Sequence, residues 1–89
     1  MKISFSEVKR AFELLIAEKE TKEDVANWAT KINFAHDDGN VEFVSIVDKE
    51  IILNGLEYLM GVDLMIDPIT YLHSKEDFIK YKTDFLDNR

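Results

Sequence analysis

The sequence predicts an all-α domain, a compact bundle of about four short helices. Apolar residues recur at three- and four-residue intervals in several segments, which is the spacing of one helical face. Serine, threonine or aspartate stands where most of these segments begin, as helix-capping residues do. With 89 residues, of which 46% are hydrophobic, the chain is expected to form a single helical domain, residues 1–89, around one modest core.

The first helix is expected over about residues 5–19. Ser4 and Glu7 have the spacing of a capping box, in which each side chain accepts a hydrogen bond from the backbone of the other residue. The apolar residues that follow at helical intervals are Val8, Ala11, Phe12, Leu15 and Ile16. They predict the face that packs into the core.

The second helix is expected over about residues 22–37 and has the clearest amphipathic pattern. Thr21 is placed to cap it, and Asp24 stands at the third position, where a carboxylate meets free backbone N–H groups. Its apolar face contains Val25, Trp28, Ala29 and Ile32, so Trp28 is expected in the core. Gly39 is expected to end the helix in a left-handed conformation.

The middle of the chain leaves two alternatives open. Asn54 and Gly55 between apolar runs are typical of a hairpin turn. A helix over about residues 49–60 is favoured instead, because Asp48 can cap it and apolar residues fall on one helical face. In that helix Gly55 would let a neighbouring helix approach closely. Residues 41–47 remain helix, strand or loop, and their apolar residues Phe43, Val44 and Ile46 are expected to point outward.

The last helix is expected over about residues 75–87. Ser74 is placed to cap it, with Asp77 at the third position. Tyr71 and Leu72 are expected to fold back onto its first turn, as in a hydrophobic staple. Its apolar face contains Phe78, Tyr81 and Phe85, which are expected in the core.

The net charge of −7 lies entirely in one part of the chain. Residues 37–67, the acidic block, hold eight acids and one base, whereas residues 1–36 hold six of each and residues 68–89 four of each. A concentrated negative field favours docking of a basic partner and argues against nucleic acid as a direct ligand. The predicted partner-binding residues are Asp37, Asp38, Glu42, Phe43, Glu50, Asn54 and Glu57.

No residue pattern predicts catalysis or a cofactor. Cysteine is absent, which excludes disulfides and thiolate sites. His36 beside two aspartates is interpreted as the end of a helix, since neighbouring helical residues point in different directions. His73 and Ser74 are interpreted as a packing residue and a cap. We therefore expect no catalytic, metal or cofactor site and no enzyme activity. Without a secretion signal or a spanning segment, the chain is expected in the cytoplasm.

Two segments resemble a known family. They are EDVANWATK, Glu23 to Lys31, and LEYLMGVDLMIDPITYLHSKEDFIKY, Leu56 to Tyr81. They are similar to short acidic bacterial proteins with a Glu-x-Val-x-x-Trp-Ala helix, a Leu-x-x-Leu-x-Gly-x-Asp-Leu segment and Tyr-Leu-His before a capped helix. Such proteins resemble immunity proteins of polymorphic-toxin and contact-dependent inhibition loci. The matching positions are Val25, Trp28, Ala29, Leu56, Leu59, Gly61, Asp63, Leu64, Tyr71, Leu72, His73 and Asp77.

The resemblance implies an immunity protein that binds a toxin domain, a basic nuclease for instance, and covers its substrate site. The expected partner is then a basic protein, a cognate toxin domain, with no direct binding of nucleic acid or membrane. The chain would act as a monomer or weak homodimer. An alternative, from the charge alone, is a small acidic regulatory adaptor or nucleic-acid mimic that binds a cytoplasmic protein.

Overall fold

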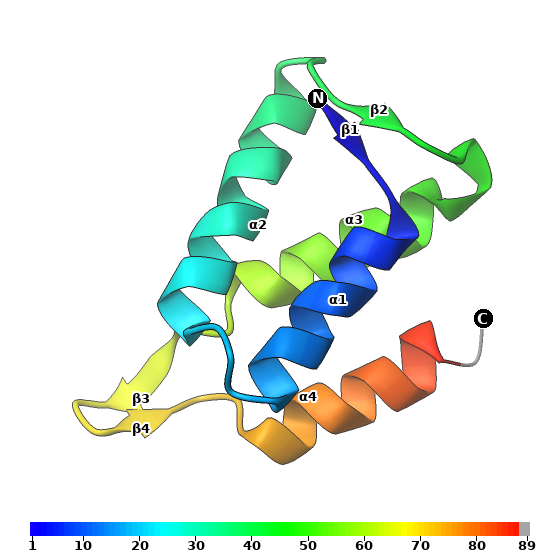
Figure 1. Cartoon of the computed structure of the whole chain (residues 1–89). Helices are drawn as coiled ribbons and strands as arrows, with labels where there is room; N and C mark the ends of the chain where they lie inside the picture. Colours follow the sequence, from blue (N-terminus) through cyan, green and yellow to red (C-terminus); the bar gives the residue numbers. More distant parts are fainter. Residues whose placement is uncertain (88–89) are drawn as a thin grey trace.

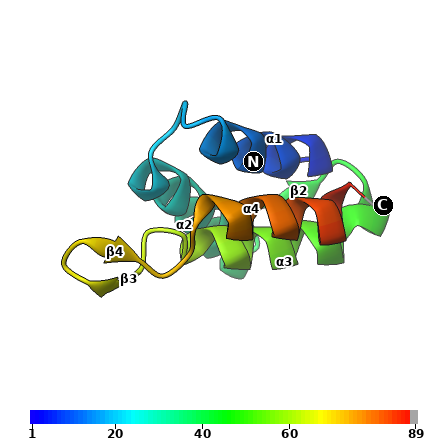
Figure 2. The same ribbon diagram turned by 90° about the horizontal axis from the view of Figure 1, so that it is seen from below.

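The computed structural model describes residues 1–87, and four α-helices make up most of them. These are α1 (Phe5–Ile16), α2 (Lys22–Asp37), α3 (Lys49–Met60) and α4 (Lys75–Tyr81). In Figure 1, α1 lies between α2 and α4, and α3 passes behind, where it packs against α1 and α2. Figure 2, turned by 90°, shows α1 and α3 in different layers. The predicted all-α fold class is confirmed.

The bounds of α2 and α3 agree with the predicted ranges, whereas α1 and α4 are shorter than predicted. α1 ends at Ile16 because Glu18, with φ +58°, turns the chain into the left-handed region. α4 ends as regular α-helix at Tyr81 and continues as a π-helical turn, Lys82–Leu86. Gly39, with φ +76°, follows the end of α2 as predicted.

Three of the four predicted helix caps are confirmed. The side chains of Ser4, Thr21 and Ser74 each accept a hydrogen bond from the backbone N–H three residues on. Asp48 makes no capping hydrogen bond through its side chain, so that prediction is wrong. The reason is local: Asp48 has helical backbone angles at the end of a 3-10 turn, Ile46–Asp48, and its side chain is buried.

The core lies where the four helices meet, and Gly55 allows a close approach of α3 to α1. A Cβ atom on Gly55 would lie 2.7 Å from Cγ1 of the buried Val8. Only a residue without a side chain allows α3 to approach α1 this closely. The predicted helix over 49–60 is therefore correct, and the alternative hairpin at Asn54 and Gly55 is wrong.

Two short pairs of strands complete the fold. β1 (Lys2–Ile3) pairs in parallel with β2 (Glu42–Phe43), and the open segment 41–47 consists of this strand, a bend and the start of the 3-10 turn Ile46–Asp48. Val44 and Ile46 are exposed as predicted, but Phe43 is half-buried against the core, contrary to the prediction. β3 (Met65–Asp67) and β4 (Thr70–Tyr71) form an antiparallel hairpin that the sequence did not predict.

None of the helices within residues 1–87 has the length and apolar character needed to cross a membrane.

Candidate functional site

The outer face of α2 differs from the rest of this acidic chain because it lacks acidic residues over most of its length. Residues 25–36 contain no acid, and no other stretch of the sequence without an acid is as long. Three side chains on this segment are exposed, those of Asn27, Lys31 and Phe34. Their spacing of four and three residues places them on one face of the helix, which we call the outer stripe of α2. It combines an amide, an ammonium and an aromatic ring.

The sequence of α2 determines which side of the helix faces solvent. The buried residues of α2 are Val25, Ala26, Ala29 and Ile32. They lie on the side that packs against α3, the neighbour with which α2 makes most of its contacts. The outer stripe falls outside this set, and Phe34 keeps 62% of its surface exposed. This phenyl ring is therefore accessible to a partner.

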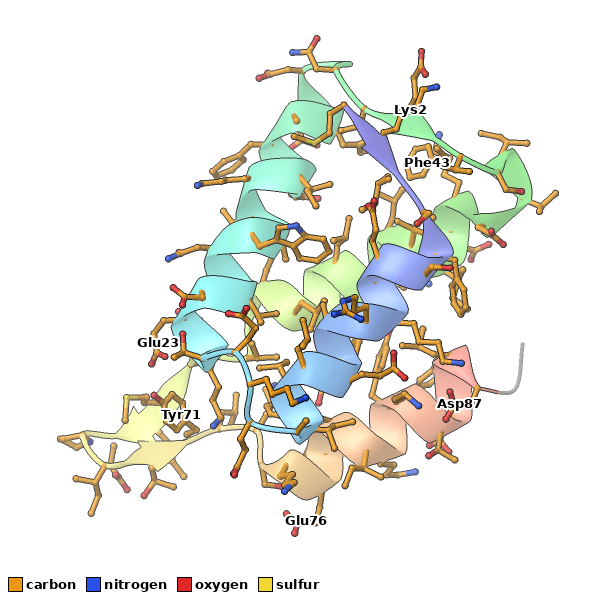
Figure 3. The ribbon with its side chains drawn as sticks, viewed as in Figure 1. Lys2, Glu23, Phe43, Tyr71, Glu76 and Asp87 are labelled. Carbon is orange, nitrogen blue, oxygen red and sulfur yellow. The ribbon has the colours of Figure 1, made fainter. Side chains whose placement is uncertain are left out.

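The amino-terminal end of α2 is tied to the β3–β4 hairpin. The hydroxyl of Tyr71 donates a hydrogen bond to the carboxylate of Glu23, and Nζ of Lys22 lies 4.5 Å from the centre of the Tyr71 ring. Figure 3 shows Glu23 and Tyr71 close together, from two different elements. The hydrogen bond from Tyr71 is the main reason that the pKa of Glu23 lies below its usual value. Tyr71 thus contacts α2, and its predicted packing with Leu72 on the first turn of α4 stays a prediction.

A cavity of about 410 Å³ separates α1 from α2. Arg10 and Trp28 line it, together with acids of both helices. Trp28 packs partly against the core, as predicted, but it also faces this cavity. The cavity leaves the side of α2 next to the outer stripe open to solvent.

Aromatic rings form a continuous surface between α3 and α4. The ring of Tyr81 stacks on that of buried Phe12, with 5.0 Å between the ring centres. Its centre also lies 4.3 Å from that of the Tyr58 ring and 4.8 Å from that of the Phe85 ring. Burial, and secondarily the charge of Asp77, raises the pKa of Tyr58 to about 12. Phe85 is 56% exposed, so its predicted place in the core is wrong. The π-helical turn shifts the helical phase there, and Leu86 is buried instead.

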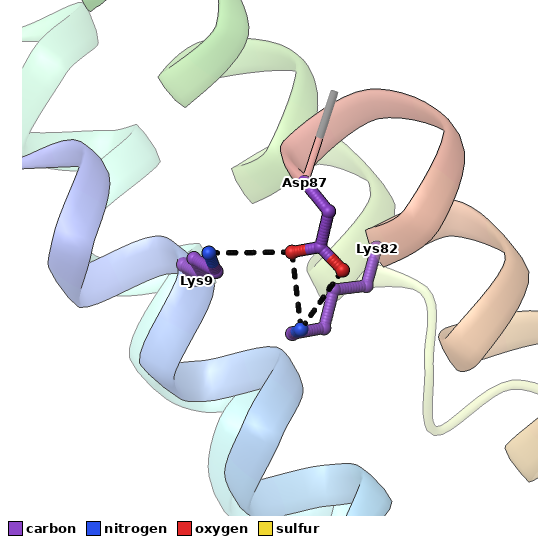
Figure 4. Close-up of polar contacts among 3 residues, drawn as sticks. All are labelled: Lys9, Lys82 and Asp87. Atoms are coloured by element: carbon purple, nitrogen blue, oxygen red, sulfur yellow. Dashed lines mark hydrogen bonds and ion pairs between the residues drawn. The ribbon is translucent and has the colours of Figure 1, made fainter. Parts of the chain in front are cut away.

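An ion-pair cluster joins the end of the π-helical turn that follows α4 to α1. Asp87 accepts from Nζ of Lys82 at 3.1 Å and lies 3.3 Å from Nζ of Lys9 on α1, as Figure 4 shows. The hydrogen bond from Lys82 is the main cause that keeps the pKa of Asp87 below its usual value. Two lysines are thereby engaged within the molecule.

The structure places the predicted partner-binding residues on two separate groups of elements. Asp37 and Asp38 end α2, and Glu42 lies on β2. Glu50, Asn54 and Glu57 are exposed on α3, where the first two line a cavity of about 260 Å³ with Tyr81 and Phe85. Burial, and secondarily the negative charge of Glu57, raises the pKa of Tyr81.

Phe43, the remaining predicted residue, is occupied within the fold. Its ring meets that of His36 edge-on at 5.6 Å, and Nζ of Lys49 lies 5.8 Å from its centre. The role of these seven residues in binding stays a prediction. Within residues 1–87 no group of three or more histidines and acids is arranged to hold a metal ion.

One family model matches the chain. The family is described as YxzC DNA-binding protein, and the match covers residues 4–85. It spans all four helices of the described structure and the β3–β4 hairpin. No curated protein and no solved structure matches the chain.

This match corrects the function predicted from the sequence. The matching family is not an immunity-protein family, so the predicted resemblance, the role of toxin inhibitor and the toxin partner are wrong. Four of the twelve matching positions are buried in the core, namely Val25, Ala29, Leu56 and Leu59. The spacing of core residues reflects helix packing, which proteins of unrelated function share. The prediction of no direct nucleic-acid binding also conflicts with the family's description.

Proposed function

The chain belongs to the YxzC DNA-binding protein family, and we propose that it binds duplex DNA through the outer stripe of α2. The match over residues 4–85 is the observation that carries this proposal. Three features of the structure support it: the order of α1 and α2, the chemistry of the outer stripe, and the local balance of charge.

α1 and α2 follow each other as the helices of a helix-turn-helix unit do. A short turn, residues 17–21, joins them, and Glu18 reverses the chain there with its positive φ. In such units the first helix crosses the DNA backbone and the second lies in the major groove. α2 has 16 residues, about 24 Å of helix, which is enough to follow the groove.

The outer stripe carries side chains that can read bases. An asparagine amide such as that of Asn27 pairs with the edge of adenine, and a lysine such as Lys31 contacts guanine or phosphate. The exposed ring of Phe34 offers apolar contact to a thymine methyl group. No acid lies between Asn27 and Phe34, and the exposed acids Glu23 and Asp38 lie one helical turn beyond the two ends of the stripe.

Local charge matters more here than the total of −7. Residues 1–36, which contain α1 and nearly all of α2, hold as many bases as acids. The Debye length at physiological salt is about 8 Å, so charges of the acidic block farther away are largely screened. The whole-chain charge was therefore the wrong quantity for excluding DNA.

Few cations are available for phosphates, so the proposed binding depends only weakly on salt. Lys19, Lys22 and Lys31 are the lysines of the turn and of α2. Three phosphate contacts give a slope of log K against log salt of about −3. A protein that depended on a broad basic face would show a much steeper slope.

Selection from a randomised duplex library, followed by fluorescence anisotropy on the selected duplex, tests the proposal. Asn27→Ala should weaken binding about 5- to 100-fold and relax the preference at one base pair. Lys31→Ala should weaken binding and reduce the salt slope by about one. The matched control is Lys75→Ala at the start of α4, which removes a lysine outside α1, α2 and the turn between them and should change the affinity less than about twofold.

The opposite results would reject the proposal. Selection that enriches no sequence, with no binding even at low salt, would exclude sequence-specific DNA binding by this chain. Equal losses from Lys31→Ala and Lys75→Ala would place the contact elsewhere. The proposed role is binding alone, with no chemistry and no cofactor, and we place it in the cytoplasm.

A further inference from the structure

The β3–β4 hairpin extends away from the helices. Residues 64–72, which we call the apolar hairpin, leave the body of the molecule after α3 and return to it before α4. Figures 1 and 2 both show it projecting past the ends of the helices. Neither β3 nor β4 pairs with any other strand of residues 1–87, so each has an open edge.

The side chains of this segment are mostly apolar, and both faces of the ribbon are exposed. Ile69 keeps 89% of its surface in solvent. The other exposed apolar residues of the segment are Leu64, Met65, Ile66 and Leu72. An antiparallel ribbon in solution normally has at least one polar face. Exposed apolar groups gathered in this way mark an interaction surface.

The apolar hairpin is held in its extended position. Tyr71 anchors its base to Glu23 of α2, and the backbone N–H of Leu72 donates to the carbonyl of Leu64 at 2.8 Å. These bonds keep the tip away from the core, so its isoleucines cannot be buried within the same chain. A two-stranded hairpin is at best marginally stable by itself, which makes a covering partner favourable.

Charge is nearly absent from the apolar hairpin. Asp67 is its only ionisable acid or base apart from tyrosine, and its carboxylate accepts from the backbone N–H of Ile69 at 2.9 Å. No lysine or arginine lies in residues 64–72 to attract DNA or an anionic membrane. A strongly basic partner would find more carboxylates on α3 than here.

We infer that a second copy of this chain docks on the apolar hairpin, forming a two-fold symmetric dimer. Two copies repel one another where their acidic blocks meet, because each block has a net charge of −7. The nearly uncharged hairpin is where they can approach, and an apolar surface is complementary to itself. The exposed apolar side chains offer about 500 Å² per copy, somewhat below the roughly 800 Å² of a standard interface, which indicates a reversible dimer.

The dimer goes beyond the DNA binding proposed above and does not depend on it. Sedimentation equilibrium on the full chain without DNA tests it directly. The expected dissociation constant is on the order of 10–100 µM, because the interface is small. Replacing both Ile66 and Ile69 by serine should raise the dissociation constant at least about a hundredfold. Each substitution removes a buried apolar side chain from both copies of the symmetric dimer.

The chain contains a matched control in the 3-10 turn before α3. Val47 is 83% exposed but lies next to Asp48 and Glu50, outside the hairpin. Val47→Ser removes a comparable exposed apolar side chain and should change the dissociation constant less than about twofold. Circular dichroism of each variant should match that of the wild type, which separates loss of the dimer from loss of the fold.

A cross-linking experiment locates the interface independently. The sequence contains no cysteine, so Ile69→Cys and Val47→Cys each introduce a single thiol. Under mild oxidation Ile69→Cys should form a covalent dimer much faster than Val47→Cys, because only the hairpin residues meet their copies. A wild-type chain that stays monomeric at millimolar concentration would overturn the inference. So would a dimer that survives the double serine change, or hairpin-dependent capture by zwitterionic lipid vesicles without self-association.

Discussion

The β3–β4 hairpin differs from the helical body in how little of it is buried. Every residue of β3 is exposed, whereas α3 alone has four fully buried positions. In the body, Val8 and Gly55 fit together so closely that a methyl group between them would clash. In the hairpin, apolar side chains of similar size contact solvent. The same residue types thus stabilise the fold in one region and remain available for association in the other.

This difference leads to opposite responses to mutation. Removing a side chain from the body leaves a cavity that its rigid neighbours cannot fill. Removing one from the hairpin exposes no new apolar surface in the monomer and leaves no cavity. Stability should therefore respond to changes in the body, and association to changes in the hairpin.

The largest expected effect is that of Phe12→Ala in the body. Phe12 is fully buried and stacks on Tyr81, so its loss should lower the free energy of unfolding by about 3–5 kcal/mol. Phe85→Ala is the matched control, since the same ring is removed from an exposed position and should cost less than about 1 kcal/mol. Urea denaturation at low protein concentration measures both. Similar costs for the two variants would contradict the burial pattern.

The hairpin variant Ile69→Ala should change the free energy of unfolding by less than about 0.5 kcal/mol in the same measurement. A loss as large as that of Phe12→Ala would mean that the hairpin contributes to the core.

Burial also explains which parts of the fold could be predicted from the sequence. α2 and α3 were predicted with correct bounds, because residues such as Val25 and Leu56 must repeat at the helical period to remain buried. The hairpin has no such constraint, so its residues show no alternation that would reveal a strand. The pairing of β1 with β2 joins residues about 40 positions apart, which local patterns do not report.

The errors at the candidate site have physical causes of their own. Phe85 was assigned to the core by assuming a regular α-helix, but the π-helical turn moves Leu86 into that place. The outer stripe of α2 was not among the predicted binding residues, because those were chosen where acids are concentrated. The useful observation was where acids are missing, between Asp24 and Asp37.

Tyrosine titration extends the comparison to electrostatics. In the body, burial raises the pKa of Tyr58 to about 12, whereas in the hairpin the hydrogen bond to Glu23 is the main cause that raises the pKa of Tyr71. Glu23→Gln should therefore shift the titration of Tyr71 and leave that of Tyr58 unchanged. Ultraviolet absorbance of variants that retain one tyrosine measures each pKa. If Glu23→Gln changed the pKa of both Tyr58 and Tyr71, the two pKa values would not have separate causes.

The raised pKa of Tyr58 also predicts a loss of stability in alkali. Because a tyrosine in the unfolded chain ionises with its ordinary pKa of about 10, the unfolded state releases the proton first as the pH rises. Protonated Tyr58 therefore contributes to the free energy of unfolding, fully below about pH 10, and this contribution is lost between about pH 10 and 12. Its size is on the order of 1 kcal/mol after allowance for solvent screening. Tyr58→Phe should reduce this slope, measured by urea denaturation across the range.

The smallest expected effect is that of Tyr71→Phe, which removes the hydroxyl that joins the hairpin to Glu23 and keeps the ring beneath Lys22. The midpoint of global unfolding should not change measurably, because the bond is exposed. Amide hydrogen exchange of Leu72, which donates to Leu64, should nevertheless become faster, since the base of the hairpin opens more often. Exchange in α3 should stay the same. Unchanged exchange at Leu72 would mean that the hairpin is held by its own backbone hydrogen bonds, and that its extended position does not require α2.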